Sequence, residues 1–243
     1  DACNSLLVVP KTGIYFLSWS VASVSNIQHV IQLRVNGAAK SRSFIYTSYA
    51  GSDTSSQALM LPLNAGDVVR LILTDPATPS IYSDTNYQTS FSGFLYEPVH
   101  GQAVAWSLTL PLDTTILGPA VINFTTVYLN EGSTWNSSAA ALQISTSGIY
   151  YVKLSGFSYN VFNLAILVNN QLLMNVVDKV DASSDVRSRA LIVHLNAGDQ
   201  LTVGVPAGYH ASSQLYETIF AGFLIQPDVV IKSRLISLAL STR

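Results

Sequence analysis

Four histidines are the residues best suited to acid–base or metal chemistry, and they are spread along the chain as His29, His100, His194 and His210. No two of them have the spacing of a metal-ligand pair, and no His-Glu-x-x-His pattern occurs. The sequence also has no Gly-x-Ser-x-Gly nucleophile motif and no glycine-rich phosphate loop. We therefore expect packed or solvated histidines and no enzymatic activity.

An aspartate-rich stretch in the second half of the chain is the candidate metal site, and it contains Asp178, Asp181 and Asp185. Carboxylate oxygens on one loop are ligands that Ca²⁺ prefers. No glycine-containing ligand loop of known spacing accompanies them, so a solvated loop is the favoured interpretation and a calcium site is the alternative. We expect no other cofactor.

The longest irregular stretch of the first half, residues 75–87, is the candidate for ligand recognition, because loops on a rigid scaffold often carry binding residues. The alternative is an ordinary connection. The corresponding stretch, residues 206–217, shares little beyond a tyrosine, which argues against a duplicated site. The candidate ligand-binding residues are Asp75, Tyr82, Asp84 and Tyr87.

Three positions bear on covalent modification. Asn123 and Asn136 begin Asn-x-Ser/Thr sequons that fit a secretory route, although such sequons also arise by chance in a chain rich in Ser and Thr. Cys3, the single cysteine, cannot form an internal disulfide, so it is free or linked to another chain, and its place near a terminus favours the link. The sequence begins at Asp1, as a processed secreted protein or a trimmed chain would, and together with the sequons this leads us to expect an extracellular location.

The composition limits the partners of the protein. Charged residues make up 11 % of the chain, against about 25 % in typical soluble domains, and hydrophobic residues make up 49 %. The net charge is −2 with scattered lysines and arginines, so nucleic acid is not an expected partner. Apolar runs are shorter than the about 18 residues that cross a bilayer, so no membrane span is expected. The hydrophobic residues must be buried within strands and between chains, which predicts an oligomer.

The chain contains an internal duplication with a period of roughly 130 residues, the size of a small domain. The matched ranges are 12–19 with 147–154, 33–37 with the stretch around Leu167, Val168 and Asn169, 58–73 with 190–205, and 91–98 with 220–227. Most of these runs are short, rich in β-branched or aromatic residues and alternating in polarity, with a turn signal beside them. The pattern predicts an all-β fold of two antiparallel sandwiches.

The tetrapeptide Asn-Ala-Gly-Asp occurs in both repeats, and its aspartates, Asp67 and Asp199, could be taken for catalytic acids. Gly66 and Gly198 tolerate a positive φ, and Asn and Asp side chains hydrogen-bond to nearby backbone. We therefore expect a tight turn between two strands at each place, without a catalytic role.

A recurring set of aromatic, amide and glycine residues runs through the front of the second repeat: Phe124, Asn130, Trp135, Gly148 and Tyr150, with aliphatic residues at Leu142, Val152 and Leu154. The first repeat keeps only the end of this pattern: Leu7, Gly13, Tyr15, Leu17 and Trp19. The pattern resembles the signature of the complement C1q globular-head family, and the blocks at 93–95 and 222–224 resemble its last strand. The family has the ten-stranded jelly roll shared with tumour necrosis factor.

This resemblance implies two tandem jelly rolls, the first incomplete at its N-terminus. It also implies a secreted, usually trimeric, non-enzymatic protein that binds proteins, sugars or other surfaces. The sequence contains no collagen-like Gly-x-y tract, the stalk that trimerises many relatives, so a trimer is less firmly implied.

The second repeat has a front strand that the first repeat lacks. We expect it at 104–110, where Trp106, Leu108 and Leu110 point one way. Residues 234–240 repeat this alternation at the end of the chain. This predicts domains at 1–98 and 99–228, and a trailing strand within 229–243 that adds to the first repeat of its own chain or, the favoured alternative, of a neighbour. The donated residues are Ile236, Leu238 and Leu240.

Two functions follow from these observations. The favoured one is self-assembly into an extracellular oligomer or filament, with copies of the chain itself as the main partners. The alternative is a soluble pattern-recognition or lectin-like protein of innate immunity that binds an extracellular protein or glycan through loops such as 75–87.

Overall fold

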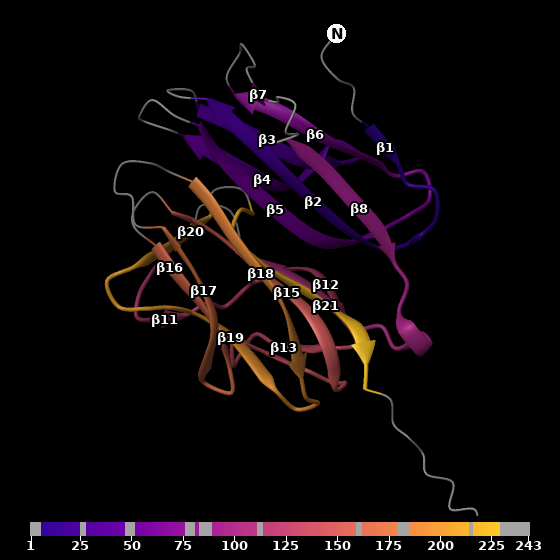
Figure 1. The fold of residues 1–243 in the computed structure, drawn as a ribbon, viewed down its shortest axis with the longest axis vertical. Coiled ribbons are helices and arrows are strands. Elements are labelled where there is room, and N and C mark those ends of the chain that lie inside the picture. Colours follow the sequence, from indigo (N-terminus) through magenta and orange to yellow (C-terminus); the bar gives the residue numbers. More distant parts are fainter. Residues whose placement is uncertain are drawn as a thin grey trace, which may run out of the picture.

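The computed structural model describes residues 6–24, 28–46, 52–75, 81–82, 89–110, 114–158, 162–178, 185–213 and 216–228. Most of them are in β-strands, and the described helical structure is one 3-10 turn, η1 (Val99–Gly101). The predicted fold class is confirmed, since two antiparallel jelly rolls pack against each other (Figure 1). We call β1–β8 the first jelly roll and β9–β21 the second.

The first jelly roll contains β1 (Leu6–Val8), β2 (Gly13–Val24), β3 (Gln28–Val35), β4 (Ala38–Tyr46), β5 (Ser52–Leu63), β6 (Val68–Asp75), β7 (Ile81–Tyr82) and β8 (Ser90–Tyr96). The second contains β9 (Ala105–Thr109), β10 (Thr114–Leu117), β11 (Ala120–Val121), β12 (Thr126–Glu131), β13 (Thr134–Asn136), β14 (Ala141–Gln143), β15 (Gly148–Ser158), β16 (Phe162–Val168), β17 (Gln171–Asp178), β18 (Asp185–Leu195), β19 (Gln200–Val205), β20 (His210–Ser213) and β21 (Ile219–Pro227).

Two sheets form the first jelly roll. One has the order β1-β6-β3-β4, and the other has β2 at its centre, with β5 on one side and β8 and the short β7 on the other. Alternate residues of β2 point inward, so that Leu17, Trp19 and Val21 are buried against Leu33 and Leu59. Strands β4 and β5 lie along one side of this sandwich, and β1 and β8 lie along the other side (Figure 1).

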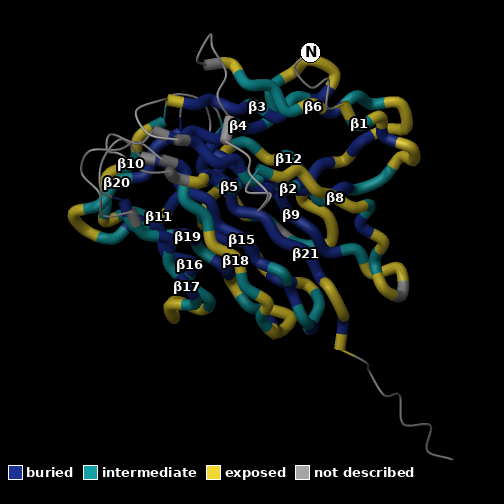
Figure 2. Tube along the Cα trace, turned by 45° about the horizontal axis from the view of Figure 1, so that its top comes forward, coloured by how far each residue is buried: buried dark blue, intermediate teal, exposed yellow. Residues whose placement is uncertain are grey.

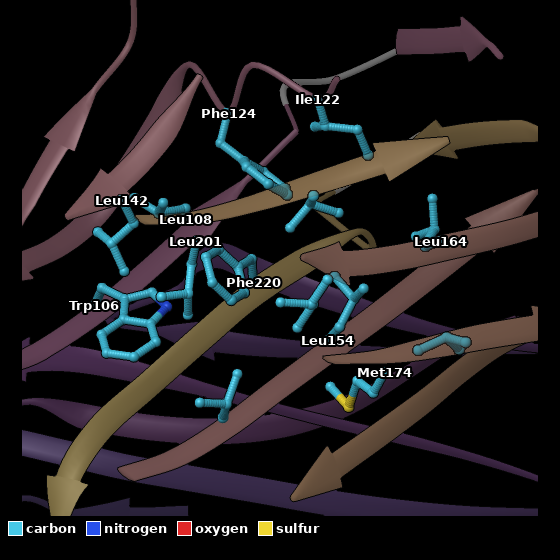
Figure 3. Close-up of a cluster of buried hydrophobic side chains, with 14 of the residues drawn as sticks. Trp106, Leu108, Ile122, Phe124, Leu142, Leu154, Leu164, Met174, Leu201 and Phe220 are labelled. Atoms are coloured by element: carbon cyan, nitrogen blue, oxygen red, sulfur yellow. The ribbon is translucent and has the colours of Figure 1, made fainter. Parts of the chain in front are cut away.

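The second jelly roll has the layers β12-β9-β21-β15-β18 and β13-β14-β19-β16-β17, and β20 pairs with strands of both. Large side chains fill its core, among them Trp106, Phe124 and Phe220, which Figure 3 shows. Tyr150 belongs to the same core. Trp106 lies 5.6 Å from Phe220 between ring centroids, and the Phe124 ring lies 6.1 Å from that of Phe220. The aromatic residues of the C1q-like pattern therefore fill the interior.

The predicted front strand is β9, which pairs with β12 on one side and β21 on the other. Trp106, Leu108 and Leu110 point into the core as expected. Strands β9 to β13 have no counterpart in the described part of the first jelly roll, which begins at β1. Strand β1 takes the place of β14, because each pairs with the strand that follows an Asn-Ala-Gly-Asp turn.

The two Asn-Ala-Gly-Asp segments are turns, as predicted. Gly66 has φ +90° and Gly198 has φ +94°, the left-handed region that glycine adopts without strain. Asp67 Oδ2 accepts a hydrogen bond from the Asn64 backbone N at 2.8 Å, and Asp199 Oδ2 accepts one from the Asn196 N at 2.7 Å. The Asn64 bond, together with one from the Asn36 side chain, lowers the pKa of Asp67. These aspartates stabilise turns.

Candidate interaction surfaces

The first candidate surface is the contact between the two jelly rolls. An edge of the first jelly roll, formed by β4 and β5, lies on the outer face of the sheet β12-β9-β21-β15-β18 (Figure 1). Met60 on β5 packs with Ala105, Leu129 and Phe223 of the second jelly roll, and all four side chains are buried. The face of β9 opposite its core is therefore covered by the other jelly roll and not by solvent (Figure 2).

An aromatic cluster occupies one end of this contact. Phe16 of the first jelly roll lies 5.4 Å from Tyr151 and 5.8 Å from Phe223, and Phe94 lies 5.8 Å from Phe223, between ring centroids. In the aligned repeats Phe16 corresponds to Tyr151 and Phe94 corresponds to Phe223. Because corresponding residues touch, the axis of the rotation that relates the two jelly rolls passes close to this cluster.

Polar contacts fix the other end of the surface. Arg42 on β4 forms an ion pair with the fully buried Glu217. The Gln57 side chain donates a hydrogen bond to the Glu217 backbone O at 2.6 Å. Tyr128 Oη donates to the Lys40 O at 2.7 Å, and its burial raises the pKa of this phenol. Since each bond joins residues of different jelly rolls, the contact has a defined register.

A lysine lies inside the contact. Lys153 is on the outer face of β15, between Tyr151, which touches Phe16, and Phe157, which touches Phe44. Its side chain is 6 % exposed, and no described residue forms a hydrogen bond or an ion pair with it. Desolvation lowers its pKa to about 8. Three further buried polar atoms of this surface lack a hydrogen-bond partner: Gln57 Oε1, Ser107 Oγ and Ser155 Oγ.

The second candidate surface is the open side of the first jelly roll. Strand β8 pairs along its length with β2, whereas the corresponding β21 pairs with both β15 and β9. Phe91 on β8 is 37 % exposed, and the corresponding Phe220 is fully buried. Leu6 and Val8 on β1 are also exposed. Within the described ranges, nothing covers this side as β9 covers β21.

A cleft of about 460 Å³ lies along the seam between β5 of the first jelly roll and β17 and β18 of the second. Hydroxyl, amide and guanidinium groups line most of it. The polar lining residues are Thr54, Ser56, Asn175, Arg187, Ser188 and Arg189. Arg189 Nη1 donates to the Asn175 O at 3.4 Å, which joins β18 to β17. The sequence indicated neither this cleft nor the contact that forms it.

The candidate binding and metal residues predicted from the sequence lie largely beyond what the structure describes. Asp75 and Tyr82 lie at the end of β6 and in β7, and Asp178 and Asp185 lie at the end of β17 and the start of β18, with only the backbone described. No group of three or more His, Cys, Asp or Glu residues among those described could hold a metal ion. Seven of the site residues predicted from the sequence lie outside the described ranges: Cys3, Asp84, Tyr87, Asp181, Ile236, Leu238 and Leu240. Their roles stay predictions.

The structure describes both sequons and the hydrogen-bond partners of two of the histidines. Asn123 and Asn136 are both exposed, so each sequon is accessible, and glycosylation stays a prediction. His29 is buried with its Nδ1 2.7 Å from Ser23 Oγ, and His194 Nε2 lies 3.0 Å from Asp228 Oδ1 at the surface. Among the described elements there is no helix of the length and hydrophobicity that a bilayer crossing requires.

The fold and the contact between its halves define a tandem jelly-roll protein. The family model described as C1q domain matches residues 6–96 and 107–225. The chain therefore belongs to the C1q domain family, in both repeats, and the resemblance drawn from the sequence is confirmed. Members of this family and of the related TNF-like proteins are typically secreted and oligomeric and generally non-enzymatic.

Three solved structures are similar to about half of this chain over nearly their own whole length. The globular domain of zebrafish complement 1qA protein is 17 % identical, with a TM-score of 0.44, over 52 % of this chain and 99 % of that one. Eiger TNF from S. frugiperda is 14 % identical, with a TM-score of 0.45, over 55 % and 99 %. Murine APRIL is 15 % identical, with a TM-score of 0.42, over 51 % and 99 %. Comparison with curated proteins found no match.

Proposed function

We propose that this protein is a secreted, non-enzymatic C1q-like protein that assembles with copies of itself into an extracellular oligomer or filament. Each copy adds the strand at residues 234–240 to the open side of the first jelly roll of a neighbour. The observation that carries the proposal is the open side itself, where Phe91 on β8 is exposed and the corresponding Phe220 on β21 is buried beside β9.

The sequence of residues 234–240 fits the place beside β8. It repeats the alternation of β9, so Ile236, Leu238 and Leu240 would enter the core of the first jelly roll as Trp106 and Leu108 enter that of the second. Burying three large aliphatic side chains contributes about 5 to 9 kcal/mol, at about 1.5 to 3 each. Exposed apolar strands and open sheet edges promote aggregation, so this strand gains by pairing. Addition to a neighbour is head-to-tail and gives rings or filaments.

The test compares the mass of the full chain with that of Ile236→Asp/Leu238→Asp by sedimentation velocity. We expect the wild type to associate and the variant to stay a single chain, because two carboxylates cannot enter an apolar core. Ser241→Asp/Thr242→Asp adds the same charge just beyond the strand and should associate as the wild type does. Association of the Ile236→Asp/Leu238→Asp variant at wild-type strength would show that this strand does not join the chains.

A second candidate function is recognition of an extracellular ligand, and the seam cleft favours it. Its hydroxyl, amide and guanidinium groups suit hydrogen bonding to a glycan. The test is binding of the full chain to a sugar array or to bacterial surfaces. Saturable binding that Arg189→Ala weakens would support this function, and its absence would leave assembly as the role.

A further inference from the structure

Two arginines lie directly opposite each other on the first jelly roll. Arg34 on β3 pairs in register with Arg70 on β6, so their side chains leave the same face of the sheet. Like charges at such positions repel each other and destabilise a sheet. Arg34 donates from Nε and Nη2 to Gln32 Oε1 at 2.9 and 2.7 Å, and neither arginine forms an ion pair with a described residue. Both positive charges therefore lack a counter-ion among the described residues.

The second repeat has an uncharged pair at the same place. Leu167 on β16 stands at the position of Arg34. Thr202 on β19 stands at the position of Arg70 and pairs with Leu167 in register. The turn beside each pair is held by the same hydrogen bond between an asparagine and an aspartate side chain. Since the same strands and turn form without these charges in one repeat, the fold does not require the two arginines. A ligand that offsets their repulsion accounts for them.

A pocket of about 240 Å³ lies at the arginine pair, in the sheet β1-β6-β3-β4 (Figure 1). Its lining residues are Arg34, Asn36, Gly37, Val68, Arg70 and Ile72. None of these is acidic, and the neighbouring Asp67 carboxylate is engaged in its turn, where it accepts hydrogen bonds from Asn36 and Asn64. Pockets for drug-sized ligands have roughly 300 to 1,000 Å³. This smaller, positively charged pocket therefore fits an anionic group on a body about the size of one sugar ring.

Apolar side chains flank the arginine pair on the same face of the sheet. Leu6 on β1 pairs in register with Arg70, and Val8 pairs with Val68. Leu6 and Val8 are both about half exposed, whereas Leu7 between them packs against the core, so this face is the outer one. A ligand at the pair would thus meet charge and apolar surface side by side. This combination suits an anionic group attached to a carbon skeleton better than a free inorganic ion.

We propose that this pocket binds a carboxylate or sulfate group carried by a ligand about the size of one sugar ring. A guanidinium can donate two parallel hydrogen bonds to such a group, and an anion between Arg34 and Arg70 replaces their repulsion by attraction to a shared partner. Val68 and Ile72 contact the carbon skeleton of the ligand. The open side at β8 belongs to the other sheet of this jelly roll, so binding in the pocket does not depend on the proposed assembly.

The first test is calorimetric titration of the full chain at low ionic strength with glucose 6-sulfate, glucuronate and uncharged glucose. We expect at least one of the two anionic sugars to bind more tightly than glucose, and the tighter one identifies the preferred group. Arg70→Thr places the residue of the second repeat at this exposed position and should weaken that binding by about tenfold or more, the effect of losing a charge-assisted hydrogen bond. Lys11→Thr removes the same charge from an exposed side chain outside the pocket and should bind as the wild type does.

The second test is urea denaturation with and without the tighter sugar. Without it, Arg70→Thr should have a higher midpoint than the wild type, because the opposed charges are gone. The sugar should raise the midpoint of the wild type and leave that of Arg70→Thr unchanged, since only the wild type binds it. Equal binding of all three sugars, or equal binding by the wild type and Arg70→Thr, overturns the proposal. A lower midpoint for Arg70→Thr without sugar also overturns it, because the arginine pair would then stabilise the strands by itself.

Discussion

At the scale of single residues, Lys153 is a buried side chain that lowers the stability of the contact between the jelly rolls. Removing an ammonium from water is costly unless a partner compensates, and the described residues supply none to Lys153. The surrounding polar atoms, Ser107 Oγ and Ser155 Oγ, also lack hydrogen-bond partners. Such a residue reduces the stability of the folded protein.

The stability of the protein should rise with pH because of this lysine. Its pKa falls from 10.5 to about 8, so between these values the unfolded chain binds a proton that the folded chain does not. Stability therefore increases as pH rises from about 8. Above about pH 10 the raised pKa of the partly buried Tyr128 and of the buried Tyr150 acts in the opposite direction, so the window is about pH 8 to 10.

Lys153→Met should remove this pH dependence. The shift corresponds to about 3 kcal/mol at about 1.4 per pKa unit, so the variant should gain about that free energy of unfolding at pH 7. Urea denaturation at several pH values measures both effects. The control is Lys11→Met, where the lysine is exposed and paired with the exposed Glu97, and a change within about 0.5 kcal/mol is expected. Equal pH slopes in wild type and Lys153→Met would contradict the assignment.

At the scale of elements, the closing strand β21 depends on a close approach to β9. A Cβ on Gly222 would lie 2.3 Å from Trp106 Cζ2 and 2.7 Å from the Tyr151 O. The Trp106 ring thus lies directly over the backbone of β21. This accounts for the glycine in the closing Gly-Phe-Leu block of the second repeat.

Gly222→Ala should accordingly destabilise the protein, because the added methyl has no space. A loss of about 1 to 3 kcal/mol is expected, as for overpacking of a core. Gly204→Ala is the control within another strand of the same jelly roll, since the nearest atoms to its Cβ would be at 3.5 and 3.7 Å. Equal denaturation midpoints for the two variants would show that the approach of Trp106 does not require glycine.

The strands could be predicted from the sequence, but the contact between the two jelly rolls could not. Alternation in β9 predicted which side enters its own core, since Trp106 and Leu108 are large and apolar. Its other side carries Ala105, Ser107 and Thr109, a pattern typical of a solvent-exposed face, yet all three are buried. Small polar residues fit a solvent surface and a tightly packed contact equally well. Strands β5 and β18 show the same, because the similar stretches 58–63 and 190–195 differ in burial, as Met60 and Ile192 do.

At the scale of the whole molecule, the chain is a pair of jelly rolls with apolar surfaces that no described residue covers. The open side at β8 and the outer face of β2 and β8 each correspond to a surface that is covered in the second jelly roll. A protein with few charged residues and several uncovered apolar surfaces gains free energy by association. The proposed head-to-tail strand addition would cover the open side at β8 with a second copy of the same chain.

Sedimentation velocity of the unmodified full chain over a dilution series tests this account most directly. We predict species of two or more chains whose average mass decreases on dilution, since every contact between chains is noncovalent unless Cys3 links them, and a reducing agent removes that link. A compact single chain at all concentrations would contradict self-assembly as the function of the protein.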